Sequence, residues 1–261
     1  MASTHPLSNP LGFLRLLANE IRWQLLQRLA GTDMHVQELV EALQQPQNLV
    51  SYHLGKLRDQ GLLREQRSIA DGREIYYTLD LGRMRSLYSE VGESLHPALS
   101  NERMPADARL NSEMNDPIRV LFLCTHNSAR SQMAEGILRS RSNSQIEVFS
   151  AGTEATRVHP LAIRAMQELH IDISSQYSKS LAQFIDQDFD YIITVCDRAK
   201  ESCPLFPGDP VRIHWSIPDP ADATGSDQER YQAFKQASIE LSTRISYLLI
   251  MIERQHDLSL D

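Results

Sequence analysis

The amino-acid sequence predicts a protein of two domains: an N-terminal winged helix-turn-helix, mostly α with a β-hairpin wing, and a C-terminal α/β domain around a four-stranded parallel sheet. Three observations lead to this prediction. The chain has 261 residues, more than one domain usually contains. Helical periodicity and a hairpin pattern fill residues 1–95, and strand-like runs alternate with helical segments over residues 118–256. Residues 96–117 are polar, lack periodicity and contain three prolines, so we expect a linker there.

The first domain is expected to begin with three helices. Leucine and isoleucine recur at helical spacing over residues 12–30, which predicts one amphipathic helix. The same period runs over residues 36–43, is interrupted at Pro46, and resumes as far as Gly61. Because proline cannot continue a helix, the second and third helices are joined by a tight turn. This is the pattern of a helix-turn-helix.

Two strand-like runs complete the first domain. They read LLREQRSI and REIYYTL, and they meet at Ala70-Asp71-Gly72. An Asp-Gly pair supplies the positive φ angles of a tight hairpin turn. A helix-turn-helix followed by a hairpin predicts a winged helix.

The second domain is expected to alternate strands and helices. Apolar runs predict strands, and amphipathic or mixed segments between them predict helices, so the sheet should be parallel. The expected strands are residues 118–124, 146–152, 191–196 and 211–215, and the expected helices are residues 128–141, 159–169 and 226–254.

Composition restricts the classes of function. A net charge of −8 with 41% hydrophobic and 23% charged residues is typical of an ordinary globular protein and argues against a generic nucleic-acid binder. The near-neutral first domain can still present a local basic face. No apolar run approaches the roughly 18 residues of a membrane span, and the N-terminus lacks a signal-peptide pattern, so we expect a cytoplasmic protein without membrane contact.

A candidate oxyanion loop follows the first strand of the second domain. It reads Cys124, Thr125, His126, Asn127, Ser128, Ala129, Arg130, Ser131. Backbone N–H groups at the start of the next helix favour an anion, and Arg130 can hold two of its oxygens. The same field is expected to lower the pKa of Cys124 and make its thiolate a nucleophile, with the Ser131 hydroxyl bonded to the sulfur. The structural alternative is a core cysteine that ends a strand.

The loop, the Ser-Ala-Gly run that ends at Gly152 and the Asp-Pro pair at Asp219 resemble the low-molecular-weight tyrosine-phosphatase superfamily, over about residues 117–255. The resemblance implies that Asp219 is the general acid, although an aspartate before proline is also common in turns. The loop has His126 where glycine is frequent and Ala129 where many thioredoxin-linked reductases have a further cysteine. We interpret His126 as a side chain that faces solvent.

The remaining cysteines distinguish two enzymes within that superfamily. All the cysteines of the chain are Cys124, Cys196 and Cys203. Cys196 ends the third strand and Cys203 follows in a polar stretch, which resembles the thioredoxin-coupled arsenate reductases. The resemblance implies a relay in which Cys124 attacks arsenate, Cys196 attacks Cys124, and Cys203 attacks Cys196. An external dithiol, thioredoxin or glutaredoxin, then reduces the last disulfide. The alternatives are a tyrosine phosphatase with two incidental cysteines, or a transcription factor without catalysis.

We expect no bound cofactor and no metal ion. The cysteine spacings do not fit a structural zinc site. Part of the reductase family binds potassium near the loop, and Asn127, Glu135 and Ser150 stand at three of its four positions. Lys179 occupies the fourth, so its ammonium group is expected to replace the ion.

The first domain resembles the ArsR family of winged-helix repressors over about residues 10–95. The resemblance implies operator DNA as a partner and a homodimer formed through this domain; the alternative is a winged helix used only for dimerisation. The candidate DNA-binding residues are Gln47, Asn48, Ser51, Tyr52, His53, Lys56 and Arg73. The region of the usual thiol sensor reads Met34-His35-Val36, so the domain contains no cysteine that could sense a metalloid, and we interpret His35 as structural.

Overall fold

A computed structural model of the protein describes residues 10–68, 70, 72–95, 117–142 and 145–257, and for residues 253–257 it describes the backbone alone. The chain divides into two compact units, Met1–Ala106 and Asp107–Asp261. Apart from residue 117, the expected linker, residues 96–117, lies outside the described residues. Each unit is described by itself.

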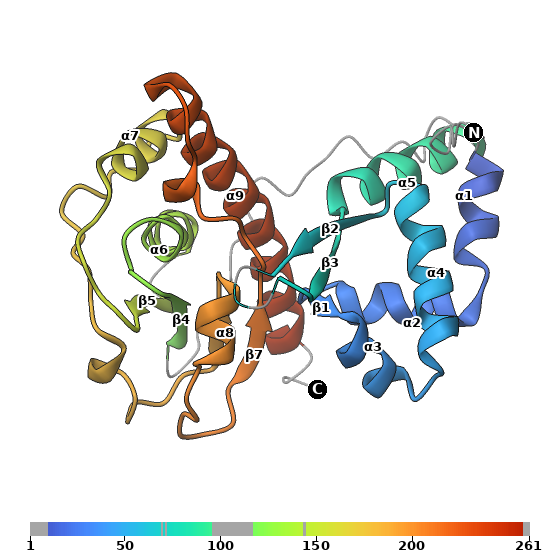
Figure 1. The fold of residues 1–261 in the computed structure, drawn as a ribbon, viewed down its shortest axis with the longest axis horizontal. Helices are drawn as coiled ribbons and strands as arrows, with labels where there is room; N and C mark the ends of the chain where they lie inside the picture. The colour runs from blue at the N-terminus through green and yellow to red at the C-terminus, as the bar shows by residue number, and fades with distance from the viewer. Residues whose placement is uncertain (1–9, 69, 71, 96–116, 143–144, 258–261) are drawn as a thin grey trace. The chain divides into compact units, whose positions relative to one another are not determined.

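The first unit is a winged helix, as predicted (Figure 1). Its three-stranded antiparallel sheet has the order β1-β3-β2, and the helices enclose a core that includes Phe13, Leu25, Leu39, Leu54 and Leu87. The elements are α1 (Pro10–Leu17), α2 (Glu20–Leu29), β1 (Met34–His35), α3 (Val36–Leu43), α4 (Gln47–Asp59), β2 (Leu63–Arg67), β3 (Ile75–Leu79) and α5 (Leu81–Leu95).

The structure corrects one expectation for this unit. The single helix expected over residues 12–30 is two helices, because Asn19 has an extended backbone and its side chain accepts a hydrogen bond from the N–H of Arg22 at 3.1 Å. A side-chain cap of this kind starts a new helix. In the wing, β2 and β3 pair from Leu63↔Leu79 to Arg67↔Ile75, and beyond them the Ser68 N–H donates to the Glu74 carbonyl at 2.9 Å. Asp71 of the expected turn lies outside the described residues.

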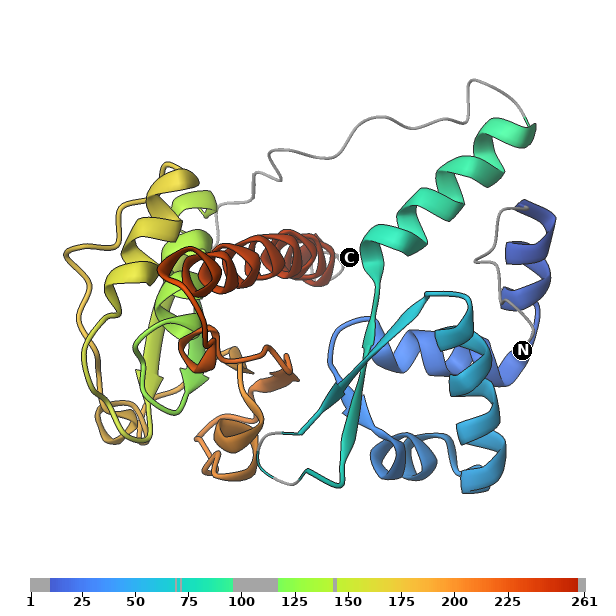
Figure 2. The same ribbon diagram turned by 45° about the horizontal axis from the view of Figure 1, so that its top comes forward.

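The second unit is the predicted α/β domain. Its four strands are all parallel, in the order β5-β4-β6-β7, and α6, α7 and α9 contact one another beside the sheet (Figure 2). The elements are β4 (Ile118–Cys124), α6 (Arg130–Arg141), β5 (Ile146–Gly152), α7 (Pro160–Glu168), β6 (Tyr191–Thr194), α8 (Asp197–Glu201), β7 (Val211–His214) and α9 (Asp227–Asp257). The short helix α8 was not expected from the sequence.

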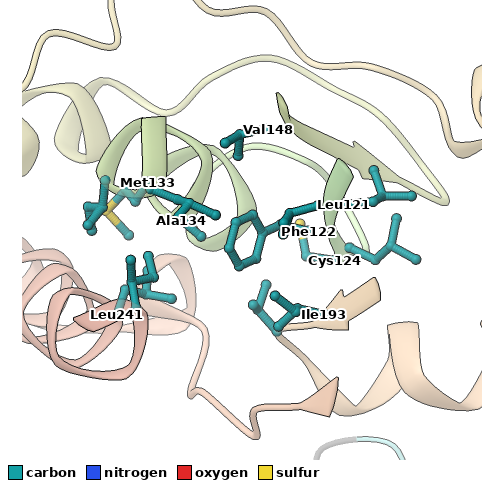
Figure 3. Packing of buried hydrophobic residues seen from close by; sticks show 14 of the residues in the cluster. Leu121, Phe122, Cys124, Met133, Ala134, Val148, Ile193 and Leu241 are labelled. Atoms are coloured by element: carbon teal, nitrogen blue, oxygen red, sulfur yellow. The ribbon is translucent and has the colours of Figure 1, made fainter. Parts of the chain in front are cut away.

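The core of this unit fixes the central strand. Phe122 of β4 is fully buried and lies beside Ala134 of α6 and Ile193 of β6, while Met133 of α6 meets Leu241 of α9 (Figure 3). A strand buried on both faces reads as a continuous apolar run, which is why its bounds were predictable. β4 and β6 are adjacent and parallel, so their carboxyl ends lie at the same edge of the sheet.

No helix among the described residues is long and apolar enough to cross a membrane.

Candidate active site

The candidate site is the loop between Cys124 at the end of β4 and Arg130 at the start of α6. Asn127 takes a left-handed conformation with φ of 46°, which bends the loop so that its backbone N–H lies 3.0 Å from the Cys124 Sγ. Three backbone bonds hold the outer side of the loop: Thr125, His126 and Ser128 accept at their carbonyl oxygens from residues 154, 156 and 159. The loop is therefore fixed from both sides by the fold.

Cys124 is nearly inaccessible and carries two polar contacts. Its side chain is 2% exposed, and its sulfur lies 2.9 Å from the Ser131 Oγ as well as beside the Asn127 N–H. Burial raises the pKa of the Cys124 thiol, while the Arg130 charge and the bonds from Ser131 and Asn127 act in the opposite direction. In this structure burial therefore outweighs the opposing effects of Arg130, Ser131 and Asn127 on the Cys124 pKa, whereas the expectation from the sequence was a lowered pKa.

Arg130 connects the loop to the segment that follows β7. Its guanidinium donates to the Ile217 carbonyl at 2.8 Å and forms an ion pair with the Asp219 carboxylate. The Arg130 side chain is 5% exposed and that of Asp219 is 17% exposed. The residues expected as anion holder and general acid therefore meet, although they are distant in sequence.

An amide and several hydroxyl groups support the loop from inside. The Asn127 Nδ2 donates to Ser131 and to Ser150 at 2.9 and 2.8 Å, and the Asn127 Oδ1 accepts from Gln132 and from the backbone N–H of Lys179. Asn127 is fully buried, so each of these bonds replaces one to water. Sequence reasoning missed Gln132; the available signal was a polar side chain two residues after Arg130, in the first turn of the helix that the loop opens.

Lys179 reaches the group of residues where we expected it to replace a metal ion. Its ammonium lies 3.1 Å from the Glu135 carboxylate and donates to the Tyr177 carbonyl at 3.2 Å. Glu135 also accepts from Ser150 and pairs with Arg139. The cation is therefore beside the carboxylate and the hydroxyl of the expected set.

Replacing Lys179 by methionine should lower the free energy of unfolding by about 3 kcal/mol, because Glu135 would remain buried with one cation fewer. Urea denaturation would measure the change. Lys235→Met is the matched control, since Lys235 pairs with Glu168 at the surface and its loss should change stability little. Equal losses in the two variants would contradict this account of Lys179.

We also expect added potassium to leave the activity of the wild-type protein unchanged.

Gly152, at the end of β5, lies directly beneath the loop. A Cβ added there would meet the Thr125 carbonyl oxygen at 2.6 Å and the Asn127 backbone nitrogen at 2.8 Å. We expect Gly152→Ala to displace the loop and abolish protection of Cys124 by phosphate against alkylation. Gly55→Ala is the control, because nothing lies within 4 Å of the added atom. Retained phosphate protection in the Gly152 variant would show that the loop tolerates the displacement.

Cys196 and Cys203 lie at the two ends of α8. The Cys196 side chain is 4% exposed, and its sulfur is 3.5 Å from the Thr125 Oγ1 of the loop. Cys203 is half-buried, and Arg212 contacts its sulfur at 3.5 Å. Burial raises the pKa of the Cys203 thiol, and the nearby Arg212 charge opposes that shift. The structure therefore places the Cys196 sulfur beside the loop, whereas the Cys203 sulfur lies beside Arg212 of β7.

Polar side chains also line a hollow of about 300 Å³ beside the loop, which sequence reasoning missed. His126 borders it, half-exposed and near Glu154, in agreement with its expected contact with solvent. His159 borders it as well; burial, with Arg230 and Arg157 nearby, lowers the pKa of this histidine, although Asp219 opposes the shift.

In the first unit, the exposed face of α4 carries most of the expected DNA-binding residues. Gln47, Asn48, Ser51, Tyr52 and Lys56 are all exposed, and the Lys56 ammonium lies over the Tyr52 ring. Arg73 of the wing is exposed too.

His53 does not belong to this face. It is 7% exposed, its Nδ1 is buried without a hydrogen-bond partner, and burial together with the Arg22 charge lowers its pKa. The expectation that His53 contacts DNA is therefore corrected: the helical period turns it toward the interior.

His35 has a structural role, as expected. It caps α3, where its Nδ1 accepts from the Glu38 N–H and the Glu38 carboxylate accepts from the His35 N–H. Within the described ranges, no three histidine, cysteine or acidic side chains gather as metal ligands would.

Comparisons with known proteins match both units. The family described as low molecular weight phosphotyrosine protein phosphatase matches residues 119–258, and the MarR family matches residues 19–74. The second match agrees with the predicted winged-helix regulator; the ArsR assignment stays a prediction. An arsenate reductase of Halalkalibacterium halodurans is 43% identical over 126 residues, which are 48% of this chain and 91% of that protein. One of Bacillus subtilis is 40% identical over the same shares. A solved arsenate reductase of Archaeoglobus fulgidus has a TM-score of 0.41 and 31% identity, over 50% of this chain and 98% of that one.

Proposed function

The chain belongs to the low molecular weight phosphotyrosine protein phosphatase family, and we propose that it is an arsenate reductase joined to a DNA-binding regulator. The carrying observation is the contact between Cys196 and the Cys124 loop, because a phosphatase needs no second thiol there. The arsenate reductases matched above, at 43% and 40% identity, support the same activity.

The proposed reaction begins at Cys124. Its thiolate attacks the arsenic of arsenate, held by the loop N–H groups and Arg130, and Asp219 protonates the oxygen that leaves as water. A thiol adduct of arsenic(V) forms. The Arg130 guanidinium that pairs with Asp219 has to bind the anion as well. Because Asp219 contacts this guanidinium, the acid lies beside the bound oxyanion.

Cys196 and Cys203 complete the proposed relay. The Cys196 thiolate attacks the sulfur of Cys124; the sulfur–arsenic bond breaks, its electron pair passes to arsenic, and arsenite leaves. The Cys203 thiolate then attacks Cys196 and expels the Cys124 thiolate. An external dithiol reduces the Cys196–Cys203 disulfide; the class of reductant is a thiol, and we propose thioredoxin or glutaredoxin.

The last internal step requires α8 to unwind. Cys196 and Cys203 flank the helix, and helical geometry over this span separates Cα atoms by about 10 Å at a rise of about 1.5 Å per residue. Disulfide formation needs Cα atoms within about 7 Å. The segment 197–203 therefore has to change conformation during each cycle.

Oxidation of NADPH in the presence of arsenate, thioredoxin and thioredoxin reductase tests the proposal. We expect a rate that depends on arsenate and on each of the three cysteines. No arsenate-dependent rate, together with rapid cleavage of p-nitrophenyl phosphate, would assign the chain to the phosphatases instead. That second candidate is favoured by the matched family description and by the Cys124, Arg130 and Asp219 set, which is all a phosphatase requires.

For the first unit we propose binding of operator DNA through α4, with Arg73 of the wing contacting phosphate. The exposed polar face of α4 supports this role. We further propose a homodimer formed through this unit, and the exposed apolar side chains of α1 and α5, Leu11, Leu14, Tyr88 and Leu95, support it. Light scattering of the full chain would measure the oligomeric state.

Replacing Gln47 by alanine should weaken binding to an operator DNA selected with the wild-type protein by about 10-fold, since one base contact is worth about 1–3 kcal/mol. Gel-shift titration at fixed salt measures the affinity. Gln27→Ala on α2 is the matched control, because Gln27 is exposed but lies outside the α4 face. An unchanged affinity for the Gln47 variant would remove this residue from the interface.

A further inference from the structure

A buried cluster of polar side chains lies behind Cys196 and has no part in the relay as described. The Asp197 carboxylate accepts at its Oδ1 from the Ser216 hydroxyl at 2.7 Å and lies 3.2 Å from the His214 Nε2. The other ring nitrogen of His214 lies 2.9 Å from the Thr194 hydroxyl. Asp197 and His214 are 2% and 4% exposed, so the contact between them is shielded from water.

The cluster holds the chain on both sides of Cys196. Thr194 is the last residue of β6, and Asp197 is the first residue of α8. The Cys196 sulfur lies in the apolar core, and its polar side-chain contact is a long one, 3.5 Å to the Thr125 Oγ1. The position of its sulfur is therefore set by the segments around it, and the Asp197 carboxylate, with its contacts to Ser216 and His214, is a buried side-chain anchor of those segments.

The other end of α8 is held differently. Arg212 contacts the Cys203 sulfur at 3.5 Å and the Pro204 carbonyl at 3.2 Å, and both contacts are exposed. An exposed contact of this kind contributes little, whereas removing a partner from a buried carboxylate is strongly unfavourable. The two ends of α8 are thus attached to β7 and its continuation with unequal strength.

We propose that Asp197, held by His214 and Ser216, is a positioning residue that keeps Cys196 beside the anion loop while α8 unwinds from its Cys203 end. This inference rests on the proposed relay. It implies that Cys203 travels to Cys196, and that the Cys124–Cys196 disulfide forms without any opening of α8.

The test uses full-length protein carrying Cys203→Ser, so that Cys124 and Cys196 are its remaining thiols. Diamide accepts two electrons and two protons from a thiol pair and so forms the disulfide. The loss of free thiols with time measures the rate of this step. We expect Asp197→Ala to slow this step at least tenfold. Asp197→Asn should restore part of the rate, because an amide oxygen can accept both bonds that now reach Oδ1. Glu201→Ala removes an exposed carboxylate from the far end of α8 and should leave the rate unchanged.

A second readout separates positioning from a general structural role. Alkylation of Cys124 by iodoacetamide, and its protection by phosphate, report on the anion loop alone and should be unchanged in Asp197→Ala. Disulfide formation at the parent rate, or loss of phosphate protection, would overturn the proposal. If Asp197→Ala does not fold, His214→Gln decides by the same two measurements. Because diamide requires no arsenate, failure of the wild-type protein to reduce arsenate would overturn the proposed function and leave this test intact.

Discussion

The Cys203→Ser variant should release one arsenite per chain and then stop, with turnover at background after the first equivalent. With serine at this position, the Cys124–Cys196 disulfide meets no internal thiol. Both of its sulfur atoms belong to side chains that are at most 4% exposed, whereas Cys203 is half-buried. An external dithiol therefore lacks access to the disulfide that accumulates.

Rapid-quench measurement of arsenite, with the full reducing system present, would show this burst. Ser202→Ala is the control: Ser202 precedes Cys203, and its hydroxyl donates to the Arg198 carbonyl of the same helical turn, so steady turnover should persist. Continued turnover of the Cys203 variant at the wild-type rate would remove Cys203 from the relay. Release of no arsenite at all would show that Cys203 acts before the first product leaves.

The sequence predicted those parts of the fold that depend on local pattern. β4 and β5 have the expected bounds: β4 is a nearly continuous apolar run in the middle of a parallel sheet, and β5 is an edge strand in which apolar and exposed residues alternate before the Ser-Ala-Gly run. The anion loop was predictable for a related reason: its residues are contiguous, and the strand before it and the helix after it fix its conformation. The parallel order of the sheet followed from the alternation of strands and helices.

Other features depend on contacts between distant residues. The pairing of Arg130 with Asp219 and that of Asp197 with His214 join segments far apart in the chain, and no local period encodes them. The break at Asn19 shows the same limit on a smaller scale, since apolar spacing alone continues through it. A histidine inside the strand-like run VRIHW was the available signal for the buried cluster, because a buried imidazole requires polar partners.

The pKa of Cys124 illustrates how two opposing effects compete. Sequence reasoning included the positive field of the loop and Arg130 and omitted the loss of solvation. The structure buries the sulfur, and that cost is the larger effect. The Arg130 charge opposes this effect and so increases the fraction of Cys124 that is thiolate at a given pH. Removing the charge therefore measures the size of its effect.

Replacing Arg130 by lysine should lower kcat/KM for arsenate by about 10³-fold, because loss of one preorganised donor at a developing charge costs about 10²–10³ and lysine cannot hold two oxygens in a plane. The variant also loses the planar contact with Ile217 and Asp219. Arg141→Lys on the same helix is the control, since Arg141 bonds to Ser242 and Ser246 of α9.

Arg130→Met separates charge from geometry. Since the Arg130 charge lowers the pKa of Cys124, its removal raises that pKa further, and less thiolate exists at any fixed pH below it. Alkylation of Cys124 should therefore be slower in Arg130→Met, and its rate should rise only at higher pH, while Arg130→Lys keeps a profile close to that of the wild type. Identical pH profiles for the wild type and Arg130→Met would mean that the guanidinium holds the anion without influencing the thiol, and the role of Arg130 would then be confined to binding.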